Sequence, residues 1–215
     1  MMNLAESQPA FRQNAIEQKL SHITQSNFLS HPFLKLSMKS NVEWVLSNYL
    51  AMSQAFPFLQ AGAQKELIFN VISSNNDVPR DYEITAAVMN FLCWDETGGH
   101  YAILENGQAG LSRIFETSER FHSNILKNDL ARFFKKEVKP NYSSITKGYL
   151  SELYVGLSSL NPIQRVASMV AFERHAQQMI DALWSSLASL FNANKDDFCT
   201  SRFMSEVMIR LKYIM

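Results

Sequence analysis

The chain has 215 residues, and its 20 lysines and arginines balance its 20 aspartates and glutamates, so its formal net charge is zero. Hydrophobic residues make up 47% and charged residues 19% of the sequence, which is typical of one globular domain with its own core. This composition excludes disordered and disulfide-rich proteins. It also disfavours nucleic acid and anionic membranes as partners, because both require clustered, unpaired Lys and Arg.

The chain is predicted to be all-α. Glycine occurs only 7 times and proline only 6 times, and no segment shows the apolar alternation of a strand. A first helix is expected over residues 9–27, followed by a break at 31–32. The capping-box pattern of 40–43 is expected to start the next helix, which Pro57 kinks or ends before 58–72.

The second half of the chain continues this pattern. Residues 73–79 are typical of a loop, and Asp81 is expected to cap a helix that runs through Trp94. Segment 109–134 holds one helix or two, which close near Pro140. The remaining helices are expected to begin at Ser143 or Ser144, at the Asn161-Pro162 start signal, and at Asp196 or Asp197. The sequence thus predicts a single-domain bundle of about seven to nine helices over 1–215.

Two further features bear on where the protein resides. Cys93 and Cys199 lie in apolar stretches and are expected to be small buried thiols of a reduced chain. Segment 1–20 lacks a basic stretch followed by an apolar one, so no secretory signal is expected. The longest mostly apolar run, 84–94, is far shorter than the ~20 residues of a membrane span. We therefore expect a soluble, cytoplasmic protein.

Three predicted helices carry a carboxylate on an otherwise apolar stripe, namely Glu96, Glu173 and Glu206. The stripes are formed by Thr85, Met89, Leu92 and Ile103, by Val166, Met169, Val170, Ile180, Trp184 and Leu187, and by Cys199, Phe203, Ile209 and Tyr213. Burying an ionised carboxylate is costly unless it meets a metal, a cation or several donors.

Two interpretations of these carboxylates stay open. Inward-facing carboxylates with histidines at helical spacing hold di-iron centres in helical bundles, and His100 follows Glu96 by four residues, hence on the same face. Alternatively, each glutamate is structural and bonds to a tyrosine or an arginine, or reaches solvent.

The other histidines are expected to contribute less. His175 is two positions from Glu173 and therefore points to another face, and His31 belongs to the chain break. His22 and His122 are expected at the surface or rim. No nucleotide-binding, zinc-protease or serine-hydrolase motif is present.

Five segments together resemble a known superfamily. They are His31-Pro32-Phe33-Leu34, Tyr49 to Pro57, Asn90 to Gly99, Phe172-Glu173, and Asp197 to Arg202. The order of elements and these motifs resemble the haem-oxygenase-like fold, shared by TenA (thiaminase II), pyrroloquinoline-quinone synthase and the non-haem iron oxidases related to the chlamydial protein CADD.

The resemblance implies an oxidoreductase that uses Fe(II) and oxygen on a small organic substrate. Its metal ligands would be Glu96, Glu173 and Glu206, with His100 as the one recoverable imidazole. At the positions where the iron oxidases have ligand histidines, this chain has Ile103, Arg202 and Ile209. The site is therefore expected to be degenerate, because imidazole helps to hold iron at neutral pH.

Two alternatives stand beside the iron oxidase. In a metal-free, thiaminase-like hydrolase or binding domain, Cys93 is the candidate nucleophile near Glu96. Arg202 would then pair with Glu173 or Glu206, and a heteroaromatic ligand would lie between Tyr49, Phe56 and Trp94. In a non-catalytic interaction protein, exposed aromatic residues along one helix would mark the partner surface. The family resemblance implies a homodimer or higher homo-oligomer.

Overall fold

The computed structural model describes residues 18, 22, 31–99, 118–192 and 194. Within these residues the main elements are the short 3-10 helix η1 and five α-helices, with no strand. Their bounds are η1 Pro32–Lys35, α2 Lys39–Ser74, α3 Arg80–Glu96, α5 His122–Phe134, α6 Ser144–Leu157 and α7 Pro162–Phe191. The all-α prediction is confirmed for this part of the chain. The helix expected from Asp196 or Asp197, and most of the one expected over 9–27, lie outside the described residues.

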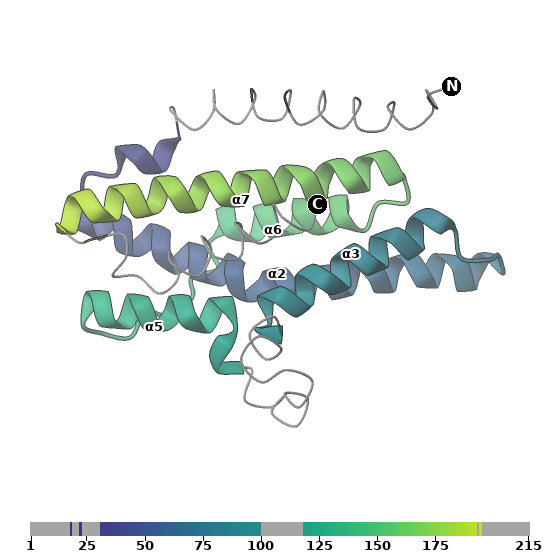
Figure 1. Ribbon diagram of the computed structural model, residues 1–215, viewed down its shortest axis with the longest axis horizontal. Coiled ribbons are helices and arrows are strands. Elements are labelled where there is room, and N and C mark those ends of the chain that lie inside the picture. Colours follow the sequence, from purple (N-terminus) through teal and green to yellow (C-terminus); the bar gives the residue numbers. More distant parts are fainter. Residues whose placement is uncertain (1–17, 19–21, 23–30, 100–117, 193, 195–215) are drawn as a thin grey trace, which may run out of the picture.

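The long helix α2 is the element against which the others are arranged (Figure 1). Helix α3 folds back along the C-terminal half of α2, whereas α5 packs on its N-terminal half. Helices α6 and α7 pack against each other, α6 also contacts α2, and η1 contacts α7. No helix in the described part is both long and apolar enough to cross a membrane.

Two apolar clusters make up the core, one at each half of α2. The first joins α2, α5 and α7 through Val42, Leu46, Leu50, Leu126, Leu130, Val138, Ile180, Leu183, Trp184 and Leu187. The second joins α2, α3 and α6 through Phe56, Ala63, Met89, Leu153 and Leu157. Each fully buried side chain of this size stabilises the fold by about 1.5–3 kcal/mol, so these clusters hold the helices together.

The start of α2 differs from the prediction. Helix α2 begins at Lys39, with Met38 as an N-cap that makes no side-chain cap bond, so the capping box expected at 40–43 does not start it. Of the two alternatives expected at Pro57, a helix end is excluded, because α2 continues through Pro57 to Ser74. A proline inside a helix costs about 3 kcal/mol. Because the core residues of α2 lie on both sides of Pro57, their burial offsets this cost.

Other boundaries are confirmed. Helix α2 ends in the predicted loop, with Asn75 in the left-handed conformation at φ 52°. The Ser143 hydroxyl accepts the backbone N–H of Thr146 at 3.3 Å and so caps α6. The Asn161 side chain caps α7, whose first residue is Pro162.

The interior face of α7 differs from prediction in its first half. Val166 and Val170 are exposed, whereas Arg165 is only 1% exposed. The guanidinium of Arg165 is satisfied by the Asp81 carboxylate, by the Thr85 hydroxyl at 2.9 Å and by the Ser159 carbonyl at 2.5 Å. These partners compensate for the hydration that the guanidinium loses. Arg165 is therefore buried, whereas the apolar pattern predicted that Val166 would be. Asp81, expected to be an N-cap, instead lies in the first turn of α3, where it binds this cation.

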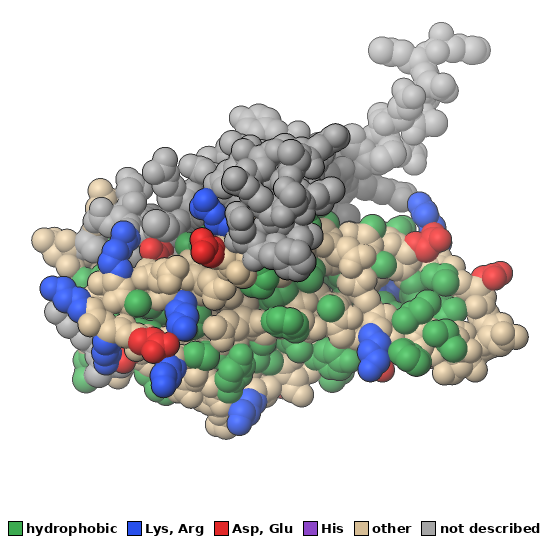
Figure 2. Space-filling model, turned by 90° about the horizontal axis from the view of Figure 1, so that it is seen from below, with side chains coloured by type: hydrophobic (Ala, Val, Ile, Leu, Met, Phe, Trp, Pro, Cys, Tyr) green, Lys and Arg blue, Asp and Glu red, His purple; other side chains and the backbone are tan. Residues whose placement is uncertain are grey.

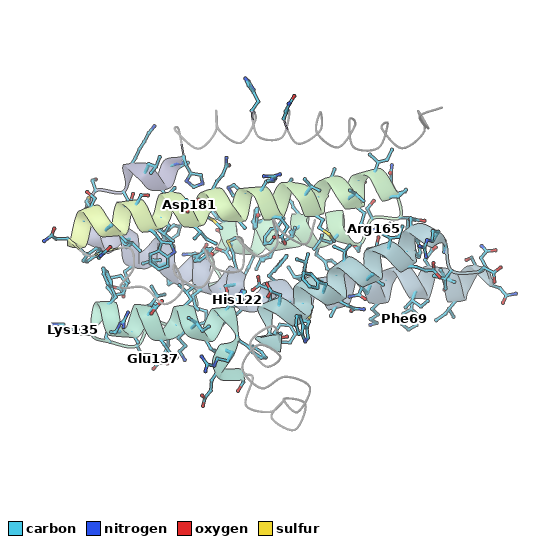
Figure 3. All side chains as sticks on the ribbon, viewed as in Figure 1. Phe69, His122, Lys135, Glu137, Arg165 and Asp181 are labelled. Atoms are coloured by element: carbon cyan, nitrogen blue, oxygen red, sulfur yellow. The ribbon has the colours of Figure 1, made fainter. Side chains whose placement is uncertain are left out.

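We predict that Arg165→Ala lowers the free energy of unfolding by about 3 kcal/mol, because it leaves the Asp81 and Thr85 groups without their partner. The measurement is urea denaturation followed by circular dichroism. Arg80→Ala is the matched control, because Arg80 also pairs with a carboxylate, that of Glu83, but its side chain is exposed. Figure 3 labels Arg165 for comparison. Its removal is expected to have the small effect typical of surface ion pairs. Equal effects of the two substitutions would contradict a structural role for Arg165.

Candidate functional site

Glu96 lies in the last turn of α3 and forms the centre of the candidate site. Its Oε2 is 3.2 Å from Nδ1 of His122, the first residue of α5 (Figure 3). The expectation that His122 is a surface or rim residue is wrong, because its side chain is buried. The spacing of four residues from His122 to Leu126 and on to Leu130, both in the core, is the sequence signal that places it inward.

The electrostatics of His122 are set by two opposing effects. Burial disfavours the imidazolium and acts to lower its pKa. The contact with Glu96, the charge of Glu96 and the charge of Asp95 act in the other direction, and the net result is a pKa above the usual 6.5. Glu96 and His122 therefore form a carboxylate–imidazolium pair over a wider pH range than an isolated histidine allows.

Glu173, on α7, lies within electrostatic reach of Glu96. Its side chain is exposed at the surface, yet the neighbouring protein atoms remove enough water from the carboxyl to raise its pKa. The charges of Glu96 and Asp95 add to this effect, and the pKa of Glu173 rises from 4.5 to about 7. Near neutral pH, Glu173 is therefore present in comparable amounts as acid and as base, which is the state suited to proton transfer.

Two further groups feel the charge of Glu96. The pKa of the Tyr49 hydroxyl, on α2, is raised above its usual range, first by burial and then by Glu96. The pKa of the Cys93 thiol, one turn before Glu96, is raised by the same two causes. Cys93 is free and only half-buried, and its Sγ donates to the carbonyl of Pro57 at 3.7 Å. These surroundings stabilise the thiol, whereas a nucleophile requires the thiolate.

The expected aromatic residues occupy different positions. Tyr49 is partly buried against the core and feels the charge of Glu96, which adds to burial in raising the pKa of its hydroxyl. Phe56 is buried, and its ring stacks on Phe172 with centroids 4.0 Å apart, so that face is already covered by protein. Trp94 lies against the backbone of Gly99, where an added Cβ would come within 2.1 Å of the indole nitrogen. Only glycine fits at that position.

Two histidines meet elsewhere, His31 at the start of η1 and His175 on α7. The rings of His31 and His175 are 5.8 Å apart, and Tyr149 is the next ring, 6.4 Å from His175. The backbone N–H of Phe33 donates to Nδ1 of His31 at 3.2 Å. Burial lowers the pKa of both histidines. The expectation that His175 points away from Glu173 agrees with these neighbours.

Gln60 is a buried polar residue that sequence reasoning missed. It is 0% exposed and lies between Phe56 and Ala63 on the inner face of α2. Neither its amide nitrogen nor its amide oxygen has a hydrogen-bond partner among the described residues. Such an amide lowers stability by about 1–3 kcal/mol unless water or a ligand supplies the missing bonds.

The donor set decides how well the described residues fit an iron centre. The structure brings together Glu96 and Glu173, two of the expected ligands, but His100, Arg202 and Glu206 lie outside the described residues. Carboxylate-bridged di-iron sites draw on four helices, two of which contribute a Glu and two a Glu-x-x-His motif. Within residues 31–99 and 118–192, no group of three or more His, Cys, Asp or Glu side chains could hold a metal ion. The described residues therefore do not fit such a centre.

No protein-family model, no curated protein and no solved structure matches this chain.

We predict that Glu96→Gln lowers the pKa of both His122 and Glu173, because it removes the charge that raises each of them. The measurement is an NMR titration of the His122 ring protons and the Glu173 side-chain carboxyl. Glu152→Gln, at an exposed position on α6, is the matched control. Unchanged pKa values in the Glu96 variant would show that this carboxylate does not organise the site.

The raised pKa of Glu173 predicts how stability depends on pH. Between its unfolded pKa of 4.5 and its folded pKa of about 7, the folded state binds more protons at this group than the unfolded state does. The free energy of unfolding therefore falls as the pH rises through this window. The stabilisation from His122, whose pKa is raised from 6.5, is likewise lost as the pH rises through its folded pKa.

Glu173→Gln is expected to flatten this decline in part and to make the protein more stable than the wild type at pH values above the folded pKa of Glu173. The measurement is chemical denaturation at a series of pH values from 5 to 9, that is, about two units on either side of the folded pKa. The Glu152→Gln control should keep the full slope. A Glu173→Gln variant with the wild-type slope would contradict the assignment.

Proposed function

We propose that this chain binds a small organic molecule beside Glu96 and Glu173 and acts on it by metal-independent acid–base chemistry. The observation that carries the proposal is the convergence on Glu96 of titratable groups from other helices. Tyr49 comes from α2, His122 from α5 and Glu173 from α7, and the pKa of each is shifted by the charge of Glu96. Clusters of mutually perturbed titratable groups are typical of catalytic and binding sites.

Each group has a role that follows from its environment. Glu173, with a pKa of about 7, accepts a proton from the substrate as a carboxylate or donates one as the acid. His122 neutralises Glu96 and fixes its orientation through the 3.2 Å contact. Burial, together with the charges of Glu96 and Asp95, holds the pKa of Glu173 near neutrality.

The two other chemistries expected from the sequence have less support among the described residues. A cysteine nucleophile is disfavoured, because the pKa of Cys93 is raised and its thiol donates to the Pro57 carbonyl. An iron oxidase lacks its full set of ligands within the described residues. We retain the haem-oxygenase-like bundle and a cytoplasmic location as parts of the proposal. The bundle is supported by the all-α fold and by the motifs given above, and the location by the free thiol of Cys93.

The proposal is tested with two probes of equal shape and opposite charge, benzamidine and benzoate. We expect benzamidine to bind preferentially near neutral pH, because its cation faces two carboxylates. Its binding should lower the pKa of Glu173 and release a proton. Isothermal calorimetry in two buffers with different ionisation enthalpies measures this release. In Glu173→Gln the proton release should disappear and the affinity should fall by about tenfold.

The outcomes separate the alternatives. The Glu152→Gln control should bind benzamidine and release the proton as the wild type does. Failure of the wild type to bind either probe, or proton release that persists in Glu173→Gln, would overturn the proposal. Anaerobic loading with Fe(II) tests the oxidase separately. Retention of about two irons per chain, lost in Glu173→Ala, would replace the metal-free interpretation with the iron enzyme.

A further inference from the structure

Helix α2 carries large apolar side chains on the face opposite to its core residues. Phe58 is 72% exposed, Phe69 is 53% exposed and Ile72 is 63% exposed. The spacings of eleven and three residues place these side chains on one side of the helix, directed away from the inner stripe that contains Phe56 and Ala63. Figure 3 shows Phe69 on the side of α2 and α3 that faces away from α7.

The antiparallel neighbour α3 continues this apolar surface. Ile84, Val88 and Phe91 are exposed and follow one another at spacings of four and three, so they form a single stripe. Figure 2 shows hydrophobic side chains gathered over the part of the molecule formed by α2 and α3. We call this surface the hairpin face and define it by Phe58, Ile68, Phe69, Ile72, Ile84, Val88 and Phe91.

The area of the hairpin face is large for a surface in contact with water. A phenylalanine side chain covers 150–250 Å² when buried, so the exposed parts of Phe58, Phe69 and Phe91 together amount to roughly 300 Å². The four aliphatic side chains add a comparable area. The total approaches the ~800 Å² that each partner contributes to a stable protein–protein interface, and exceeds the apolar patch of an ordinary monomer.

The charges around the hairpin face identify the kind of partner. Lys65 lies within it, with its Nζ 5.7 Å from the centre of the Phe69 ring, and Glu66 follows. Near the loop between the helices, Asp77 and the ion pair of Arg80 with Glu83 are exposed. Both signs are present in similar numbers. A nucleic acid or an anionic membrane requires an excess of positive charge, whereas a surface with both signs can complement a second copy of itself.

We propose that the hairpin face joins two copies of this chain in a symmetric dimer. In a two-fold interface the same patch is used on both sides, so α2 and α3 of each copy meet their counterparts as two helical hairpins. Each exposed stripe then packs against helices of the other copy, as the inner stripes do within one chain. This inference is independent of the chemistry proposed at Glu96.

Analytical ultracentrifugation of the full chain over about 1–100 µM tests the proposal, because a dimer with a dissociation constant in the micromolar range or below is populated at these concentrations. The expected mass is twice the 24.6 kDa of one chain. Phe69→Glu places two like charges in the interface and should weaken dimerisation by at least about tenfold, and Phe58→Glu should act in the same way. The matched control is Ile163→Glu, because Ile163 is an 80% exposed apolar residue on α7, outside the hairpin face.

Circular dichroism and thermal denaturation establish that each variant folds. A dimer that Phe69→Glu and Phe58→Glu disrupt and that Ile163→Glu leaves intact would support the proposal. A wild-type chain that stays monomeric at the highest concentration would overturn it, since another part of the chain or a different protein would then cover the face. Retention of the dimer in both hairpin variants, or its loss in all three variants, would overturn it as well.

Discussion

The negative charge of Glu96, held where four helices meet, is the constraint on which the chemistry of this protein depends. A carboxylate removed from water loses hydration energy and must recover it from its neighbours. Glu96 recovers part of it from His122 at 3.2 Å. The same charge acts on the other groups nearby and raises the pKa of Tyr49, of Cys93 and of Glu173. One ionised group thus sets the protonation of the whole cluster, and Glu173 is the member whose pKa it brings into the physiological range.

Arg165 shows how the same fold treats a charge that serves structure. Its partners are the Asp81 carboxylate, a hydroxyl and a backbone carbonyl, and the last two do not titrate near neutral pH. The guanidinium joins α3 to the start of α7. Around Glu96 the partners are imidazole, carboxyl, phenol and thiol, all of which can exchange protons. The contrast between fixed and titratable partners, more than burial itself, distinguishes a structural charge from a chemical one.

Local sequence signals predicted the elements whose causes are local. Ser143 and Asn161 cap their helices as expected because a side chain and the next turn suffice to form the cap. Periodicity failed at Arg165, because two of the three partners that satisfy the guanidinium, Asp81 and Thr85, lie 80 or more positions away in sequence, on α3. At His122 the spacing to Leu126 and Leu130 indicates an inward position, but no local pattern reveals the carboxylate that the imidazole meets on another helix.

The hairpin face was not predicted from the sequence, and the apolar patterns of α2 and α3 explain why. A helix at the surface of a monomer normally has one apolar and one polar side, whereas apolar residues all round indicate burial. On α3 the stripe of Thr85 and Met89 faces the core, and the stripe of Ile84 and Val88, shifted by one residue, faces outward. Two adjacent apolar stripes blur the periodicity that predicts an inner face, so the sequence gives little contrast between them. The two apolar stripes of such a helix each need a packing partner. The described residues of one chain cover only the inner stripe, so the outer stripe is left for a second partner.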